Sequence, residues 1–351
     1  MKTNSRFLAL LVGAVAIGTA ALLPLGAAAL LPAVAEAGPA ANCDRACLDG
    51  IVEQYLAALP THDPARAPLA PEVRYTEDGI ELSLPDGLWR TASAVGKYRL
   101  VVADPEQGEV GFFAKMRENG APVLLATRLR VVDRKITQIE SVVARSSDFF
   151  GAASGSHPHD VLGDAPRPQF RQVLPPADRR SRQQMIDIVN TYFTGIENNT
   201  GARPPLFASD CNRIENGAYT TNRPLRAGGQ PSSLNYSCKE AFALGYYHND
   251  TRIRDRRYLV IDRERGLVYA SVEFDHDATI RSYRLKNGRT VVVKRTAPWT
   301  WMANEIFQIN REGRISQVEA VLLSVPYGMR PGWHTGVHIA SPQAVRDHFT
   351  E

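Results

Sequence analysis

The amino-acid sequence contains one arrangement of segments twice, and this internal duplication limits the folds that the chain can adopt. The phrase IVEQYLAAL at residues 51–59 returns as IVNTYFTGI at residues 188–196. The segment ITQIESVV at residues 136–143 returns as ISQVEAVL at residues 315–322. Two amphipathic helices can resemble each other by chance, but matches in the same order along both halves indicate an internal repeat with a long period.

Each half reads as a helix, a helical turn, a strand, an insertion and three or four alternating strands joined by hairpins. We therefore predict an α+β fold of two tandem units, each a curved antiparallel sheet covered by helices. A sheet covered on one side only leaves an apolar face, so we expect the units to pack through their sheets as a pseudo-dimer. Shorter matches support the repeat: Arg66, Pro68 and Leu69 with Arg203, Pro205 and Leu206; Glu77-Asp78-Gly79 with Glu215-Asn216-Gly217; and residues 103–108 with residues 261–266.

Composition sets the boundaries of these units. The stretch between them is rich in Gly, Ser, Pro and His without periodicity, which is typical of a linker or of an ordered strap over the surface. The second unit is longer than the first, with insertions between Tyr219 and Cys238 and between His276 and Pro298. The first insertion has the turn residues of a surface loop or lid. The predicted order is a signal peptide at 1–37, a first unit at 43–150, a linker at 151–180, a second unit at 181–333 and a tail at 334–351.

The amino terminus has the pattern of a secretory signal. Lys2 and Arg6 precede an apolar run over residues 7–31, and Ala35-Glu36-Ala37 resembles a small-residue cleavage site. The run is also long enough to span a bilayer as an uncleaved anchor, although its two prolines weaken that alternative. We expect a secreted or periplasmic protein.

The four cysteines all follow the signal segment, and an even number in an oxidising compartment indicates two disulfides. Three connectivities are possible. Cys43 and Cys47 are four residues apart at an expected helix start, where their Cα atoms are close enough to bridge, which leaves Cys211 with Cys238. A Cys-x-x-x-Cys pair can also bind a metal, but no histidine or second pair flanks it at ligand spacing.

The charge pattern argues against a nucleic-acid partner. The net charge of +4 is spread along the chain, and the basic run at residues 252–257 is interrupted by Asp255. The sequence contains no P-loop, dinucleotide fingerprint, nucleophile elbow or helical His-Glu-x-x-His, which disfavours kinases, oxidoreductases and hydrolases. We expect no cofactor and no metal.

The order of elements resembles the cone-shaped fold of the nuclear transport factor 2-like superfamily, also called SnoaL-like. The phrases CDRACLDGIVEQYLAAL, DGLWRTAS, PWTWMANEIF and VPYGM are similar to those of an uncharacterised tandem group of that superfamily in bacteria and fungi. The superfamily includes dehydratases, ketosteroid isomerases, polyketide cyclases and binding modules without catalysis. The resemblance implies a few polar residues inside an apolar cone, one of them an acid or base whose pKa the dry pocket shifts.

The first candidate residue is Glu305, in the expected strand over residues 299–309. Alternation places it on the same face as Trp301 and other aromatic or aliphatic residues, so we expect it to be buried with a raised pKa. The matching position of the first unit is Thr127, so the shared scaffold does not require a carboxylate there. The alternative is an ion pair with Arg252 or Arg281.

A second group of candidates lies where the insertion helix gives way to a long strand, at the expected mouth of the cone. It contains Tyr246, Tyr247, His248, Asp250 and Arg252. In an extended segment His248 and Asp250 would share a face, giving an imidazole oriented by a carboxylate. The alternative is a hydrogen-bonded loop histidine with no role in chemistry.

The third group is Asp275-His276-Asp277 at the end of the next strand. Consecutive strand residues point to opposite faces, so these three side chains cannot converge on one metal ion. Turn capping or a salt bridge is the expected role of the two aspartates, while Asp275 and His276 are also candidates for contact with a substrate.

These groups lie in the second unit, where we therefore place the site. We predict an exported, cofactor-independent lyase or isomerase, resembling a dehydratase, that abstracts a proton from a small organic molecule; the alternative is an exported protein that binds a small molecule without catalysis. We expect no membrane contact beyond the signal segment, and either a monomer with an internal pseudo-dimer or a homodimer. The predicted catalytic residues are His248, Glu305, Asp250 and Tyr247, and the predicted substrate-binding residues are Arg252, Asp275, His276, Trp301 and Tyr246.

Overall fold

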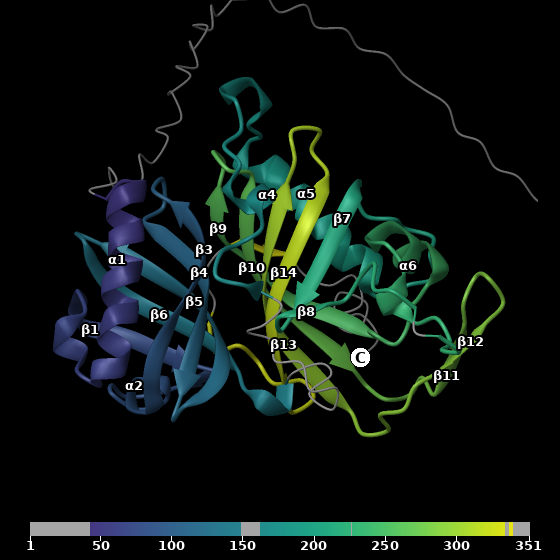
Figure 1. Ribbon diagram of the computed structural model, residues 1–351, viewed down its shortest axis with the longest axis horizontal. Helices are drawn as coiled ribbons and strands as arrows, with labels where there is room; N and C mark the ends of the chain where they lie inside the picture. The colour runs from purple at the N-terminus through teal and green to yellow at the C-terminus, as the bar shows by residue number, and fades with distance from the viewer. Residues whose placement is uncertain (1–42, 149–161, 226, 334–336, 340–351) are drawn as a thin grey trace, which may run out of the picture. The chain divides into compact units, whose positions relative to one another are not determined.

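The computed structural model describes residues 43–148, 162–225, 227–333 and 337–339, all within one compact unit (Figure 1). The predicted signal peptide, residues 149–161 of the predicted linker and most of the predicted tail lie outside the described residues. We call residues 43–148 the first half and residues 181–333 the second half.

The first half begins with the predicted helix, α1 (Arg45–Ala58). The Asp44 side chain caps it by accepting a hydrogen bond from the Cys47 backbone N–H at 2.9 Å. The strands form a six-stranded sheet in the order β2-β1-β6-β5-β4-β3. The other elements are η1 (Leu59–Thr61), η2 (Pro64–Arg66), β1 (Leu69–Glu77), β2 (Ile80–Glu81), α2 (Leu88–Thr91), β3 (Ala92–Asp104), β4 (Glu109–Glu118), β5 (Ala121–Val132), β6 (Lys135–Ala144) and η3 (Ser146–Asp148).

The second half repeats this plan. Helix α5 (Arg182–Ile196) starts at a capping box between Ser181 and Gln184. The sheet order is β15-β9-β10-β13-β14-β7-β8, the order of the first half with one strand added at the edge. The other elements are β7 (Phe207–Glu215), β8 (Ala218–Tyr219), η6 (Ser233–Asn235), α6 (Cys238–Leu244), β9 (Arg252–Asp262), β10 (Leu267–His276), β11 (Ser282–Arg284), β12 (Thr290–Val292), β13 (Trp299–Ile309), β14 (Ile315–Val325) and β15 (Val337–Ile339).

The prediction of purely antiparallel sheets is wrong. Strand β1 runs parallel to β6, and β7 runs parallel to β14, so both sheets are mixed. Hairpins force only consecutive strands to be antiparallel. The pairs β1–β6 and β7–β14 are far apart in sequence, and nothing local to either strand specifies their direction.

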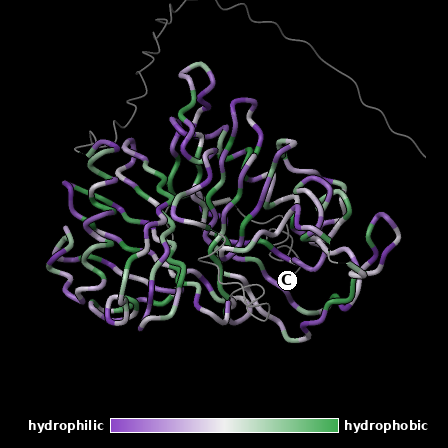
Figure 2. Tube along the Cα trace, viewed as in Figure 1, coloured by the Kyte–Doolittle hydropathy of each residue, from purple (hydrophilic) through white to green (hydrophobic). Residues whose placement is uncertain are grey.

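The two sheets pack against each other, as predicted. One face of each sheet is covered by a helix of the same half, α1 on the first sheet and α5 on the second (Figure 1). The opposite faces share one hydrophobic core, which contains Phe113 and Val142 of the first half and Tyr269 and Val321 of the second. Figure 2 shows the hydrophobic stretches of both halves running along these strands.

The contact between the sheets follows the internal repeat. Strand β3 lies against β9 and β6 against β14, so equivalent strands of the two halves meet. Tyr269 packs over Gly111, its own repeat equivalent, where an added Cβ would lie 2.5 Å from the ring. The repeated carboxylates Glu140 and Glu319 both cross the contact, accepting hydrogen bonds from Arg257 and Tyr98 respectively. This arrangement is an internal counterpart of an isologous dimer interface.

The described part of the predicted linker is an ordered strap. It contains the short helices α4 (Pro168–Arg171) and η5 (Pro176–Asp178). Leu162 and Phe170 are buried in the core between the sheets. Trp333, at the end of the second half, is also buried, with its Nε1 donating to Thr76 Oγ1 at 2.5 Å. Both segments tie the halves together.

Two disulfides are present, Cys43–Cys47 and Cys211–Cys238, in the connectivity that the spacing favoured. The first closes the turn at the start of α1. The second joins β7 to the start of α6 across 27 residues and is buried. Disulfides of this kind fit an oxidising compartment.

We expect the Cys211→Ser, Cys238→Ser double variant to lose about 3 kcal/mol in its free energy of unfolding, because the bridge no longer restricts a long loop of the unfolded chain. The Cys43–Cys47 bridge closes a far shorter loop, so the Cys43→Ser, Cys47→Ser variant should lose less of its free energy of unfolding. Urea unfolding of the oxidised proteins measures both values. Equal losses would contradict this explanation.

Candidate functional site

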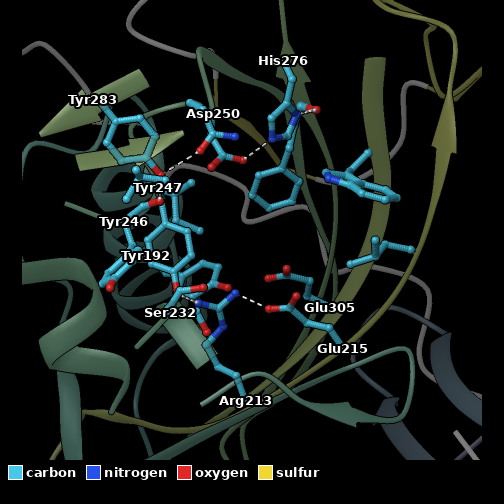
Figure 3. Close-up of a pocket in the computed structure, with 17 residues that line it drawn as sticks. Tyr192, Arg213, Glu215, Ser232, Tyr246, Tyr247, Asp250, His276, Tyr283 and Glu305 are labelled. Atoms are coloured by element: carbon cyan, nitrogen blue, oxygen red, sulfur yellow. Dashed lines mark hydrogen bonds and ion pairs between the residues drawn. The ribbon is translucent and has the colours of Figure 1, made fainter. Parts of the chain in front are cut away.

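A cavity of about 350 Å³ opens in the second half, within the size range of small-molecule sites. Its walls combine aromatic rings with a few charged groups, as Figure 3 shows. They come from α5, four strands of the sheet, the turn after α6 and the two insertions. The lining residues include Tyr192, Arg213, Glu215, Ser232, Ser233, Tyr246, Tyr247, Asp250, Phe274, His276, Tyr283, Val291, Trp301 and Glu305.

Glu305 lies on the face of β13 that the alternation predicted, and is 3% exposed. Its neighbours on the adjacent strands are Ala270 and Ala320, which leave open space beside the carboxyl group. The equivalent residue of the first half is Thr127, as predicted from the repeat, and it bonds to Ser141 at 2.9 Å instead. The small neighbours therefore turn a packed position into part of a cavity.

Burial raises the pKa of Glu305 to about 8, although the positive charge of Arg213 opposes the shift. Its Oε2 atom is buried without a hydrogen-bond partner among the described residues. The ion pair considered as an alternative is not formed, because Arg252 binds Asp275 and Arg281 donates to the Thr296 carbonyl. Glu305 is thus a carboxyl group that holds its proton more tightly than in water, and it has unused hydrogen-bonding capacity.

Arg213 and Tyr192 are site residues that the sequence did not reveal. Arg213, on β7, forms an ion pair with Glu215 and donates to the Tyr247 hydroxyl at 2.5 Å. Tyr192, on α5, has a buried hydroxyl without a hydrogen-bond partner among the described residues, and burial raises its pKa well above the usual value. Its ring lies 5.5 Å from the Arg213 guanidinium. In Figure 3 the Arg213 side chain points toward Glu215 and Glu305.

The internal repeat could have identified Arg213 as a site residue. The repeat aligns Glu215 with Glu77 and Arg213 with Tyr75. In the first half the Tyr75 hydroxyl donates to Glu77 at 2.5 Å, whereas in the second half Arg213 forms an ion pair with Glu215 at the equivalent position. The glutamate is the same in both halves, whereas the residue two positions before it changes from Tyr75 to Arg213. This difference distinguishes the second half at Arg213.

Asp250 pairs with His276, not with His248 as predicted. The His276 Nε2 atom lies 3.0 Å from Asp250 Oδ1, and the imidazole is stacked on Trp299 with 4.1 Å between ring centroids. The His276 Nδ1 atom faces the Phe274 carbonyl at 3.2 Å. Both ring nitrogens therefore lie within hydrogen-bond distance of oxygen atoms.

His248 does not line the cavity. Its ring packs against Tyr283, with 5.5 Å between centroids. The prediction assumed an extended segment, whereas residues 246–249 form a turn after α6, in which side chains two positions apart do not share a face. Tyr246, Tyr247 and Asp250 of the same segment do line the cavity.

Asp275 and Arg252 belong to a structural cluster outside the cavity. Asp275 accepts hydrogen bonds from Arg252 at 2.8 Å, Arg254 at 2.9 Å and Thr300 at 2.6 Å. Burial opposes ionisation of Asp275, but these hydrogen bonds outweigh it and lower the pKa. The assignment of Asp275 and Arg252 to substrate binding therefore has no support in the geometry, while His276 and Trp301 do line the cavity.

The remaining aspartate of the third group caps a turn, as one of the predicted roles required. Asp277 accepts hydrogen bonds from the Thr279 backbone N–H at 2.9 Å and hydroxyl at 2.7 Å. Among the described residues, no group of three or more His, Cys, Asp or Glu side chains has the arrangement of a metal site.

Both insertions of the second half form walls of the cavity. Ser232 and Ser233 come from the first insertion, and Tyr283 and Val291 come from the β11–β12 hairpin of the second. The Tyr283 hydroxyl holds the hairpin in place by donating to the Tyr246 carbonyl at 2.5 Å. The insertions thus account for a cavity in this half.

The equivalent region of the first half is filled. Trp89 is fully buried and packs edge-on against Tyr55, the equivalent of Tyr192, with 5.4 Å between ring centroids. Leu88 and Val143 belong to the same core. This asymmetry agrees with the placement of the site in the second half.

Comparisons with known proteins give a family but no activity. No curated protein matches the sequence. Within the described residues, no helix is long and apolar enough to cross a membrane. One solved structure with similarity is a de novo designed protein with curved beta-sheet, with 20% identity and a TM-score of 0.25, over 28% of this chain and 87% of that chain. A family model described as "Domain of unknown function (DUF8021)" matches residues 41–143 and 178–322, more than two thirds of the chain. The chain therefore belongs to the DUF8021 family.

Proposed function

We propose that the protein is an exported, cofactor-independent lyase or isomerase that transfers a proton within the cavity of the second half. The observation that carries this proposal is Glu305, a buried carboxyl group with a pKa of about 8 and an unpartnered oxygen, facing the cavity together with the unpartnered Tyr192 hydroxyl. A pKa near the working pH suits a group that takes and returns a proton. The two disulfides support export, and the repeated α+β plan supports the resemblance to the nuclear transport factor 2-like superfamily.

The neighbouring groups supply the other parts of such a reaction. Removing a proton beside a carbonyl group places negative charge on the carbonyl oxygen. The Tyr192 hydroxyl and the Arg213 guanidinium are buried donors that can stabilise this charge in a site of low dielectric. His276, held by Asp250, can donate a proton to a leaving group or to a second carbon.

A carrier or sensor that binds a small molecule without catalysis is the second candidate. The aromatic walls favour it, because Tyr246, Tyr283, Phe274 and Trp301 give contact area without reacting. The two functions differ in what Glu305 does. A carrier needs Glu305 only for a hydrogen bond, which glutamine can also form. A lyase needs its carboxyl group to take up and release a proton.

We expect Glu305→Gln and His276→Ala each to lower turnover by roughly 100-fold or more, because each removes a proton-transfer group. The substrate can be found by metabolite profiling of a deletion strain, followed by incubation of the accumulated compound with pure protein. His248→Ala is the matched control, since its side chain is outside the cavity, and it should retain turnover. A Glu305→Gln protein that binds the compound and still converts it would exclude the proposed role.

A further inference from the structure

The β11–β12 hairpin next to the cavity is strongly basic. Between Thr279 and Ala297 there are six basic residues and no acidic one. The net charge of the whole chain is only +4, so the chain outside this segment carries a net negative charge. The positive charge is therefore concentrated in the segment 279–297, which contains the β11–β12 hairpin and is called the hairpin segment. The six residues are Arg281, Arg284, Lys286, Arg289, Lys294 and Arg295.

These charges are available to a partner. All six side chains are exposed except that of Arg289, which is half-buried. Their hydrogen bonds go to neutral groups, such as those of Arg284 to the Gly288 carbonyl and of Lys286 to the Gly201 carbonyl. Arg289 donates to the Tyr246 hydroxyl at 3.0 Å. None of the six forms an ion pair with a carboxylate of the described part of the chain.

The hairpin is an addition to the repeat. In the first half β4 and β5 are joined by the short turn at Asn119 and Gly120, because Glu118 pairs directly with Ala121. The equivalent pair of the second half is His276 with Trp299, and residues 277–298 are inserted between them. The inserted segment also supplies Tyr283 and Val291 to the cavity wall. Basic surface and cavity are thus parts of one continuous region.

We propose that the hairpin captures an acidic polysaccharide and presents one of its uronate units to the cavity. The basic residues are spread over residues 281–295, outside a cavity of about 350 Å³, so a ligand that meets both must be longer than one small molecule. Inside the cavity, Trp301 and the tyrosines offer ring faces to the C–H side of a sugar. The pairs Arg213–Glu215 and His276–Asp250 offer hydrogen bonds to its hydroxyl and carboxylate groups.

The chemistry of a uronate matches the proposed function, on which this choice of ligand rests. Glu305, in its ionised form, is the base that takes the proton from the carbon that bears the carboxylate. The electrons of that C–H bond form a carbon–carbon double bond to the next ring carbon, whose bond to the glycosidic oxygen breaks. The leaving oxygen keeps that electron pair and accepts a proton from an acid such as His276. The step needs no oxidant, reductant or co-reactant. A nucleic acid offers no carboxylate beside such a carbon, which favours the glycan.

Binding of a linear polygalacturonate to the full protein tests the capture surface. The test variant is Arg284→Gln, Lys286→Gln, Lys294→Gln, and the matched control removes three exposed charges of the first half, as Arg66→Gln, Arg117→Gln, Lys135→Gln. We expect the Kd of the test variant to rise by about 10-fold or more, and that of the control to stay near the wild-type value. Added salt should weaken wild-type binding, and a neutral glucan of equal length should not bind.

The inference is overturned if both triple variants lose binding equally, if neither does, or if the neutral glucan binds as well as the polyuronate. It is also overturned if single-stranded DNA or vesicles of anionic lipid bind and the polyuronate does not. The reaction is read separately, from the ultraviolet absorbance of the unsaturated product. Glu305→Gln should bind the polyuronate and release no product. Wild-type protein that binds through the hairpin and releases no product would support the capture surface and contradict the proposed lyase.

Discussion

Glu305→Gln is expected to be more stable than the wild-type protein at pH 9, by on the order of 4 kcal/mol. The pKa of Glu305 is raised by burial from 4.5 to about 8. The folded state therefore binds more protons than the unfolded state between these two pH values, so wild-type stability falls as the pH rises through this window. Each unit of the difference is worth about 1.4 kcal/mol. Glutamine cannot ionise, and Arg213 keeps Glu215 as its partner.

Urea unfolding at pH 5, 7 and 9 measures this effect. The gain of the variant should be small at pH 5, larger at pH 7 and largest at pH 9. Burial also raises the pKa of Glu319, to about 7, so Glu319→Gln should remove a second part of the pH dependence that ends at lower pH. The exposed Glu81 is the control, and Glu81→Gln should leave the slope unchanged. A Glu305→Gln protein with the same pH slope as the wild type would show that Glu305 is ionised throughout.

The second large effect is expected at the contact between the halves. Glu140→Gln should lower the free energy of unfolding by about 3 kcal/mol or more, because it leaves the buried cation of Arg257 without its carboxylate. Arg257 is 0% exposed and donates to both oxygens of Glu140, at 3.1 and 2.5 Å. Its only other hydrogen bond within the described residues goes to the Ser271 hydroxyl, which does not neutralise the charge.

Two comparisons separate this effect from a general loss of packing. Glu140→Leu with Arg257→Met replaces both charges by apolar side chains and should be more stable than Glu140→Gln alone. The ion pair between Arg74 and Glu81 is exposed, so Glu81→Gln should cost no more than about 1 kcal/mol. If Glu140→Gln loses as little as Glu81→Gln, the pair does not hold the halves together.

Local sequence patterns predicted the features that depend on neighbouring residues. The phrases at residues 51–59 and 188–196 are in helices, and the strand alternation placed Glu305 on the same face as Trp301 and Phe307. The equivalence of Glu305 with Thr127 also followed from the repeat, because both strands pair in matching register. These predictions succeeded because helix and strand periodicity is decided within a few residues of each position.

Features that depend on distant contacts were decided only by the tertiary structure. The sequence spacing suggested a pair of His248 with Asp250, but the sheet brings His276 of β10 to Asp250 instead. Arg213 becomes a site residue because β7 lies two strands away from β13 in the same sheet. Strand pairing determines which side chains meet, and residues far apart in the chain set that pairing.

The sequence by itself indicated a duplicated α+β chain and a buried carboxyl group in the second half, and it favoured one of three possible cysteine pairings. Only the tertiary structure decided that β1 and β7 run parallel to their partners and that Trp89 fills the first half. It also decided that the two insertions of the second half, with Ala270 and Ala320 beside Glu305, leave a cavity there. The physical reason is that periodicity specifies which face of a segment is buried, whereas the volume left above that face depends on side chains from several segments that meet only in the folded protein.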